Sequence, residues 1–218
     1  MSRLGFVGGT GPQGLGLALR FALAGEAVVI GSRSASRAND AARRILAAVP
    51  GAVAEGVENL DAIDRADRIL LTLPAAALPG FLESAGDRLA GKLVIDVAVP
   101  VVLREGVFEL APVPGAPSAG ELVQKALPSA RVVSAFKNVP AGRLQDLHAT
   151  LEGDVVLCGE DAAARAEVAA LVTKLPGLRA VDAGRLANAR YLEAITALLL
   201  NLNRKFGALT SIAVVGLR

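Results

Sequence analysis

The sequence predicts an α/β fold, a doubly wound, mostly parallel sheet with a C-terminal helical extension. Short apolar runs alternate with longer helix-like stretches almost throughout the 218 residues, which is typical of a parallel sheet covered on both faces. A glycine-rich turn at residues 9–14 lies between the first apolar run and the first helix-like stretch. The content of hydrophobic residues, 53%, is enough for one sizeable core.

The glycine-rich turn Gly9-Thr10-Gly11-Pro12-Gln13-Gly14 has the spacing G-x-G-x-x-G and follows a predicted strand at residues 4–7. Before a helix, here residues 15–24, this spacing is the fingerprint of a dinucleotide-binding fold. The first glycine permits the tight turn, the second lets the backbone approach a pyrophosphate, and the third lets helix and strand pack closely. Pro12 suits the first helical turn, and the free N–H groups there favour a phosphate. We expect a bound nucleotide, with a plain glycine loop as the alternative.

The segment after the second β-branched run indicates which dinucleotide binds. An NAD site of this kind has an Asp or Glu there to accept from the ribose 2′-OH, but no acidic residue stands between Glu26 and Asp40. Ser32, Arg33 and Arg37 instead offer a hydroxyl and two guanidinium groups, which suit a 2′-phosphate. The sequence therefore predicts an NADP-binding Rossmann fold; a solvated, serine-capped helix start is the alternative.

The alternation continues along the chain. After residues 4–7 and 27–30, further strands are predicted at residues 68–73, 92–97, 131–136, 154–158 and 178–182, with a short edge strand near 52–54 as another candidate. Helices are predicted at residues 36–48, 59–66, 75–89, from Ser118 onward, just after Ala141, and at 161–175 and 186–206. Ser118 has Glu121 three residues later, the spacing of a capping box. Residues 98–117 contain four prolines and no period, so we predict a long irregular loop, a feature that is often functional.

The last predicted helix is apolar on most of its faces, at Tyr191, Leu192, Ile195, Leu198, Leu199 and Leu202. Such a helix is covered by more than its own domain, and a second subunit is the simpler cover. Complete burial within one chain is the alternative.

Composition excludes several classes of function. The net charge is +2, and basic residues do not interleave with aromatic ones, so nucleic-acid binding is not indicated. The single cysteine, Cys158, excludes an internal disulfide and is predicted to be a small core residue. The N-terminus has no signal-like pattern, and the apolar stretch 194–202 is too short and too polar to span a membrane. We expect a soluble cytoplasmic protein.

Catalytic side chains are scarce. The only histidine, His148, lies far from the predicted cofactor loops, and the sequence has no Ser–His–Asp set, metal-ligand cluster or Tyr-x-x-x-Lys pair. Lys137-Asn138 follows a strand, but its spacing differs from the Lys-x-x-x-Asn pair of hydroxyacid dehydrogenases. We therefore predict no catalytic acid or base and no metal. Hydride exchange between two cofactors fits this scarcity, because it needs ordered stacking of two rings rather than acid–base work.

Four motifs resemble those of NADPH-dependent F-420 reductases (F-420:NADP oxidoreductases). They are GGTGPQGLGLA at residues 8–18, IGSR at 30–33, AFKNVPA at 135–141 and DAGRLANAR at 182–190. The first two are shared with other NADP folds, whereas the last two, in this order, are more specific. The similarity covers the whole chain, including its length and its late leucine-rich helix. It implies reversible hydride transfer between NADP(H) and the 8-hydroxy-5-deazaflavin coenzyme F-420, in a homodimer.

The resemblance also implies site residues. The pyrophosphate would lie on residues 10–13, the 2′-phosphate on Ser32, Arg33 and Arg37, and Ala141 would close over the nicotinamide. The full set for NADP is Gly9, Thr10, Gly11, Pro12, Gln13, Gly14, Ser32, Arg33, Arg37, Leu73, Ala77, Val99 and Ala141. Leu73, Ala77 and Val99 would line the crevice at strand ends, although an ordinary core position is the alternative for each.

Lys137, Asn138 and Val139 are the candidates for contact with the second coenzyme. Lys137 departs from the family pattern, which prefers an uncharged donor there. With six Phe, one Tyr and no Trp in the chain, the deazaflavin would stack on the nicotinamide and on aliphatic walls.

The same reading divides the chain into an NADP-binding domain, residues 1–183, and a C-terminal helix and tail, residues 184–218. The second part would form a dimer contact and part of the deazaflavin cleft. Two other functions stay open. One is an NADP-dependent reductase of the same fold that acts on an imine, a pyrroline or a metal chelate, and the other is a non-enzymatic NADP(H) sensor.

Overall fold

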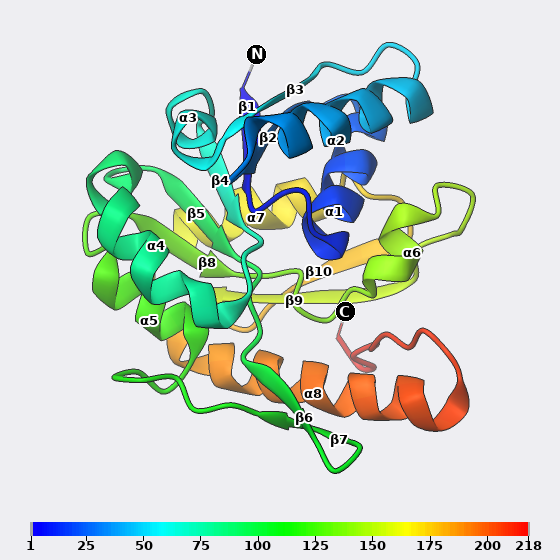
Figure 1. The fold of residues 1–218 in the computed structure, drawn as a ribbon. Helices are drawn as coiled ribbons and strands as arrows, with labels where there is room; N and C mark the ends of the chain where they lie inside the picture. Colours follow the sequence, from blue (N-terminus) through cyan, green and yellow to red (C-terminus); the bar gives the residue numbers. More distant parts are fainter. Residues whose placement is uncertain (1, 218) are drawn as a thin grey trace.

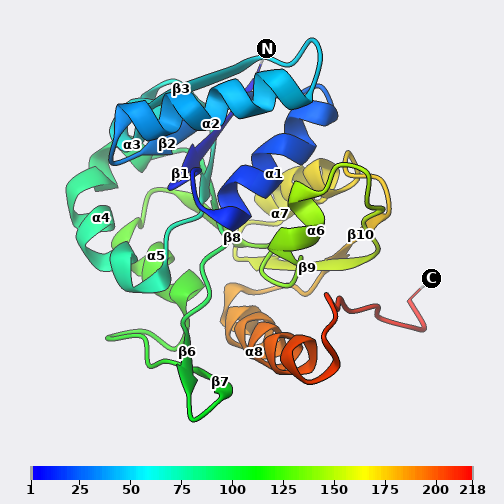
Figure 2. The ribbon, with the colours of Figure 1, turned by 45° about the vertical axis from the view of Figure 1, so that its right-hand side comes forward.

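A computed structural model describes residues 2–217 and confirms the predicted fold class. Its eight-stranded sheet has the order β10-β9-β8-β5-β4-β1-β2-β3, with helices on both faces (Figures 1 and 2). Neighbouring strands are parallel, except that β8 and β9 are antiparallel. Six neighbouring strands, in the order β3-β2-β1-β4-β5-β8, follow the order of a dinucleotide-binding fold. Strands β9 and β10 extend the sheet at one edge.

The strands of this sheet lie close to the predicted ones. They are β1 Arg3–Val7, β2 Ala27–Ser32, β3 Ala54–Glu58, β4 Arg68–Leu71, β5 Leu93–Asp96, β8 Arg131–Ser134, β9 Gly153–Gly159 and β10 Leu178–Asp182. The helices are α1 Pro12–Leu23, α2 Ala35–Ala48, α3 Asn59–Asp64, α4 Leu78–Ala85, α5 Ala119–Ala126, α6 Ala141–Gln145, α7 Ala162–Val172 and α8 Ala189–Phe206. Short 3₁₀ turns are η1 Ala75–Ala77, η2 Gly86–Leu89 and η3 Leu186–Asn188.

Two apolar layers make up the core. One includes a row of aromatic rings, Phe6, Phe21 and Phe136, in which Phe21 and Phe136 meet edge to face with ring centres 5.8 Å apart. This contact fixes the segment after β8 onto α1. The other layer packs α4, α5 and the start of α8 on the opposite face, through residues such as Leu78, Val123 and Leu192.

The prediction of an irregular loop over residues 98–117 was wrong in its middle. Residues 101–110 form a hairpin of β6 Val101–Arg104 and β7 Val107–Leu110. Its turn residues Glu105 and Gly106 both have positive φ, the backbone of a tight two-residue hairpin turn. The hairpin lies against α8, where the Asn201 side chain bonds both backbone groups of Phe108 (Figure 2). Flanking prolines concealed this short element in the sequence.

Two smaller differences concern boundaries. The single helix predicted over residues 75–89 is divided into η1, α4 and η2, because Pro79-Gly80 stands in the first turn of α4. The edge strand candidate at residues 52–54 lies too early, since β3 begins at Ala54. Ser118 caps α5 as predicted, accepting from the backbone N–H of Glu121 at 3.1 Å.

Helix α8 has one buried face and one exposed face within the chain. Leu199 is 5% exposed, whereas its neighbour Leu198 is 57% and Tyr191 61% exposed. Full burial of the helix within one chain is therefore excluded. Within residues 2–217, no helix is long and apolar enough to cross a membrane.

Candidate functional site

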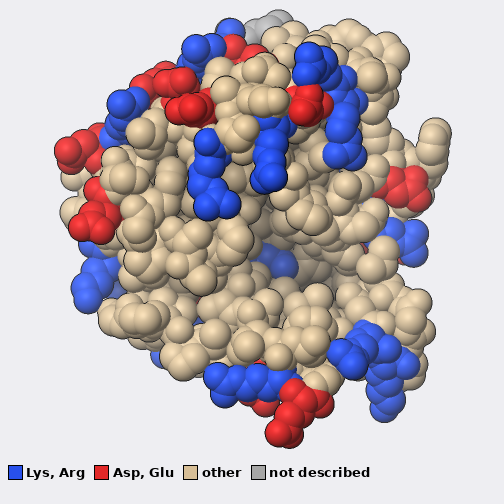
Figure 3. Space-filling view, in the orientation of Figure 1, with Lys and Arg blue, Asp and Glu red and all other residues tan. Residues whose placement is uncertain are grey.

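A cleft of about 430 Å³ opens at the carboxyl ends of the parallel strands. It lies beside the point where the strand order reverses between β1 and β4, the place where open α/β sheets bind ligands. Figure 3 shows this face hollowed, with Lys and Arg side chains gathered above the hollow. The cleft is lined by Gly8, Thr10, Gly11, Pro12, Gln13, Ser32, Arg33, Ser34, Arg37, Asn59, Thr72, Leu73, Pro74, Ala75, Val97, Ala98, Val99 and Lys137.

The glycines of the turn have separate structural roles. Gly8, with φ +74°, rather than Gly9, supplies the left-handed residue that the tight turn needs. A Cβ on Gly9 would lie 2.7 Å from the Cβ of Phe6, and one on Gly14 would lie 2.5 Å from Thr72 Oγ1. Gly9 and Gly14 therefore lie behind the cleft and let α1 pack against β1 and β4, as expected for the last glycine.

The start of α1 is open toward the cleft. Gly11 caps the helix and Pro12 stands in its first turn, as predicted. A Cβ on Gly11 would have no neighbour closer than 3.6 Å, so a pyrophosphate can approach the backbone there. The Gln13 side chain donates to the backbone oxygens of Phe136 (3.1 Å) and Val139 (3.2 Å), so it holds the turn after β8 against α1.

The end of β2 brings Ser32, Arg33 and Arg37 together on one wall of the cleft. Ser34, not Ser32, caps α2, accepting from the Arg37 N–H at 3.4 Å. Arg33 and Arg37 are exposed residues, Ser32 is buried, and all three line the cleft. A hydroxyl and two cations at this position fit a 2′-phosphate.

The other expected NADP residues are divided. Leu73 and Val99 line the cleft, whereas Ala77 and Ala141 are outside its wall and Ala75 stands where Ala77 was expected. The sequence analysis missed Asn59, whose Oδ1 accepts from the Gly8 N–H at 3.0 Å and so supports the turn. It also missed Ser34, Thr72, Pro74, Ala75, Val97 and Ala98, whose only signal in the sequence is a position at or just after a strand end.

Lys137 lies at the inner end of the cleft, and its side chain is fully buried. Its ammonium group donates to Asp96 Oδ2 at 2.6 Å, to Glu193 Oε1 at 3.1 Å and to the backbone oxygen of Ala98. Burial alone lowers the pKa of Lys137, but Asp96 and Glu193 outweigh it and hold that pKa above its usual value. All three N–H donors of the ammonium thus have partners inside the protein.

The next two residues are also buried. The Asn138 side chain donates to the backbone oxygen of Asp154 at 2.6 Å, and Val139 is 4% exposed. With Lys137, they border a small hollow of about 100 Å³ beside Ala141 and Thr196.

Two larger hollows lie on either side. An apolar recess of about 560 Å³ joins the cleft at Pro74, Ala75 and Val99. Its remaining wall comes from residues on both sides of the β6–β7 hairpin and from α5, including Pro100, Pro112, Val113 and Leu122. These residues define the recess. Their side chains are all apolar, so the recess suits a flat apolar ring.

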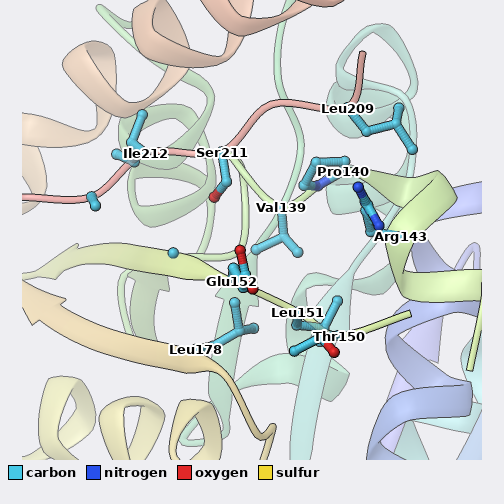
Figure 4. A pocket seen from close by; sticks show the side chains of 12 residues that line it. Val139, Pro140, Arg143, Thr150, Leu151, Glu152, Leu178, Leu209, Ser211 and Ile212 are labelled. Atoms are coloured by element: carbon cyan, nitrogen blue, oxygen red, sulfur yellow. The ribbon is translucent and has the colours of Figure 1, made fainter. Parts of the chain in front are cut away.

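The second hollow is a groove of about 560 Å³ between α6, the start of β9 and the tail, shown in Figure 4. Arg143 and Glu152 border it, so its charges are mixed, and the glycine turn does not contribute to it. His148 is exposed and lines none of these hollows. Cys158 is buried as predicted, and burial raises the pKa of its thiol to about 12.

Comparisons with known proteins agree with this geometry. A family model described as "NADP oxidoreductase coenzyme F-420-dependent" matches residues 3–100. The F-420-dependent NADP reductase of Methanocaldococcus jannaschii is 37% identical over 211 residues, covering 94% of this chain and 93% of that protein. The Methanothermobacter marburgensis reductase is 38% identical over 210 residues, covering 93% of each.

A solved structure shows the same fold over its full length. The candidate F-420-dependent NADP reductase from Arthrobacter sp. FB24 superposes with a TM-score of 0.80 at 26% identity, and the match covers 100% of both chains. The relatives match almost from end to end, and the glycine turn and the basic residues after β2 line one cleft. The chain therefore belongs to the F-420-dependent NADP reductase family.

Proposed function

We infer that this protein catalyses reversible hydride transfer between NADP(H) and coenzyme F-420. One observation carries the NADP side of this inference: the glycine turn and the basic end of β2 line a single cleft at the strand-order reversal. Family membership supplies the second coenzyme. When bound, NADPH supplies a hydride and the deazaflavin ring accepts it, so the protein has to hold and orient two rings.

The proposed NADP site keeps those expected residues that line the cleft. We place the 2′-phosphate at Ser32, Arg33 and Arg37 and the pyrophosphate over residues 10–13, where α1 begins. The nicotinamide end then lies toward Val99 and Lys137 at the inner part of the cleft. Ala77 and Ala141 stay proposals that the cleft wall does not support, because neither residue lines it.

We place the deazaflavin ring in the apolar recess. The recess joins the cleft at Val99 and has a volume of about 560 Å³, within the range of small-molecule sites, whereas the hollow at Lys137–Val139 has about 100 Å³. Leu122→Trp should fill the recess and raise the KM for F-420 several-fold, with the Kd for NADPH unchanged. Leu209→Trp, which fills the groove at α6 instead, is the matched control. If Leu209→Trp raises the KM for F-420 more than Leu122→Trp does, the ring binds in the groove instead.

We also propose the finer features expected from the sequence. The sheet ends at Asp182, which supports a division into an NADP-binding part, residues 1–183, and a helix and tail, residues 184–218. The exposed apolar side chains of α8 support a homodimer. A cytoplasmic location stays a prediction from the sequence.

The direct test mixes the protein with NADPH and oxidised F-420 and follows the visible absorbance of the deazaflavin. We expect bleaching at a rate proportional to enzyme, and much slower bleaching with NADH. Binding of NADPH without any bleaching would favour the sensor. Oxidation of NADPH by a cyclic imine or a ferric chelate, but not by F-420, would favour another reductase.

A further inference from the structure

Asp96, Lys137 and Glu193 form a buried cluster of three charged groups, here called the charge cluster. Their side chains are 0%, 0% and 2% exposed, and they come from β5, the segment after β8, and α8. Ser134 Oγ donates to Asp96 Oδ2 at 2.9 Å, and the Ala119 N–H donates to Glu193 Oε1 at 3.0 Å. Two carboxylates thus share one ammonium group and several neutral donors.

A cluster of this kind has a large free-energy cost if its only role is to stabilise the fold. Removing three charges from water carries a large desolvation cost, and apolar side chains of similar volume are often as stable or more so. Buried groups with displaced pKa values gather at functional sites. Here the cluster borders the cleft, because Lys137 lines it and the ammonium group also holds the backbone oxygen of Ala98, between Val97 and Val99 of the same wall.

The charges of the cluster do not cancel. One ammonium and two carboxylates give a formal charge of −1. Two N–H donors bond Glu193 Oε1, from Lys137 and Ala119, and such donors favour the ionised carboxylate although burial raises the pKa of Glu193. The inner end of the proposed cofactor cleft is therefore backed, behind Lys137, by a buried cluster with a net negative charge that water does not screen.

We propose that the charge cluster is a positioning device that makes the cleft favour oxidised over reduced nicotinamide. The inference rests on the proposed function for the orientation of NADP. A hydride leaves NADPH with both bonding electrons, so the neutral dihydronicotinamide ring becomes a cation while the acceptor gains the negative charge. A negative cluster near that ring stabilises the cation and leaves the neutral ring unaffected.

The test measures binding of each coenzyme by calorimetry in the absence of F-420. Glu193→Gln keeps the shape and an acceptor oxygen for Ala119 but brings the cluster to zero charge. The ratio of the Kd for NADP⁺ to the Kd for NADPH should rise about tenfold, the order of effect expected when one unscreened charge near the ring is removed. Asp96→Asn removes one negative charge from β5 rather than from α8 and should shift the ratio in the same direction.

Glu121→Gln is the matched control. Glu121 also links α5 to α8, through Arg190 at 3.3 Å, but it does not line the cleft. Its ratio should stay within twofold of the wild type. Equal weakening of both coenzymes in Glu193→Gln and Asp96→Asn would overturn the proposal, since a purely structural role predicts that outcome.

The wild type provides a test that needs no variant. Burial raises the pKa of Glu193, so acid converts the cluster to its neutral form, and the Kd ratio should rise as the pH falls. The titratable groups that face Glu193 are Lys137 and Asp96, and nearby Cys158 stays neutral because its pKa is about 12. The 2′-phosphate is common to both coenzymes and cancels in the ratio.

A ratio that does not change with pH would contradict the cluster's role. If the ratio of the Kd values shifts as expected but F-420 is not reduced, the proposed function fails and the role of the cluster stands.

Discussion

Arg33 lies between β2 and the cap of α2, and Arg37 lies in the first turn of α2, both on the same wall of the cleft as Ser32. The cap of α2 is Ser34, and Ser32 Oγ accepts from the Ser34 N–H at 3.3 Å, so the O–H of Ser32 remains available to donate. Local chain geometry therefore leaves one hydroxyl and two guanidinium groups for an anion at this place. Charge-assisted hydrogen bonds of this kind contribute about 1.5–3 kcal/mol each.

Arg33→Asp should reduce the preference for NADPH over NADH at least about tenfold, because it removes such a contact and repels the 2′-phosphate. The ratio of kcat/KM values for the two coenzymes measures this. Arg44 lies on the exposed side of α2. Arg44→Asp makes the same change of charge away from the cleft and is the control. If the two variants behave alike, the 2′-phosphate binds elsewhere.

His148 is expected to contribute little to turnover. It is exposed, borders none of the hollows described above, and uses only its backbone N–H in a bond to Asp146. His148→Ala should keep turnover within about threefold of the wild type, whereas loss of a general acid or base typically costs about 10²–10⁴-fold. A loss of that size with an unchanged circular dichroism spectrum would reveal a proton-transfer role.

At the scale of elements, the tail after α8 is fastened to the edge of the sheet. The Asp154 N–H at the start of β9 donates to the backbone oxygen of Ile212 at 2.8 Å. The Asp154 carboxylate accepts from Arg179 Nε and Nη2, both at 2.7 Å, and from the Val214 N–H. These bonds, led by those from Arg179, hold the pKa of Asp154 below its usual value.

Asp154→Asn should lower the free energy of unfolding at pH 7 by about 1.5–3 kcal/mol, the range for bonds to a charged group. Since the folded pKa of Asp154 lies below its unfolded value, this stabilisation is complete above the unfolded value. It is lost as the pH falls through the folded pKa. Urea unfolding at pH 7 and near pH 3 should therefore show the difference from wild type shrinking in acid.

Asp182→Asn is the control for this element. Asp182, on the neighbouring strand β10, pairs with Arg165 of α7 at 2.9 Å, but its side chain is 49% exposed. Exposed pairs contribute about 0–1 kcal/mol, so this variant should lose less stability. An equal loss in the two variants would show that burial of the Asp154 pair is unimportant.

At the scale of the whole molecule, α8 and the hairpin expose apolar side chains together. Tyr191 and Leu198 on α8, and Leu103 and Val107 on the hairpin, are between 49% and 61% exposed. The two elements are joined by the bonds between Asn201 and Phe108 and lie side by side (Figure 2). Large apolar patches on soluble proteins mark interfaces, which supports the proposed homodimer.

Leu198→Arg should dissociate that dimer, because an unpaired charge in a buried interface costs several kcal/mol. Leu198 is 57% exposed in the single chain, so the folded monomer should tolerate the arginine. Sedimentation should give a dimer for the wild type at micromolar concentration and a monomer for the variant. Turnover of F-420 should fall more than binding of NADPH.

Leu23→Arg changes a leucine of similar exposure, 54%, at the end of α1 and should leave the dimer intact. A wild type that sediments as a monomer would exclude the proposal. So would a monomeric Leu198→Arg variant with full activity.

The sequence by itself determined the sheet, its helices and the NADP side of the cleft. Strand runs, Pro12 at the start of α1 and the basic residues after β2 act through near neighbours in the chain, and parallel strands bring their carboxyl ends to one edge. It did not determine the hairpin at residues 101–110, because the support from Asn201 comes 93 positions later.

Only the tertiary structure determined the partners of the Lys137 ammonium group. Asp96 and Glu193 lie 41 and 56 positions from it, and no local pattern announces that they meet. The same holds for Ala75, which lines the cleft in place of Ala77 because η1 turns between them. Charge compensation in a core depends on which strands become neighbours, and that is settled only when the sheet is assembled.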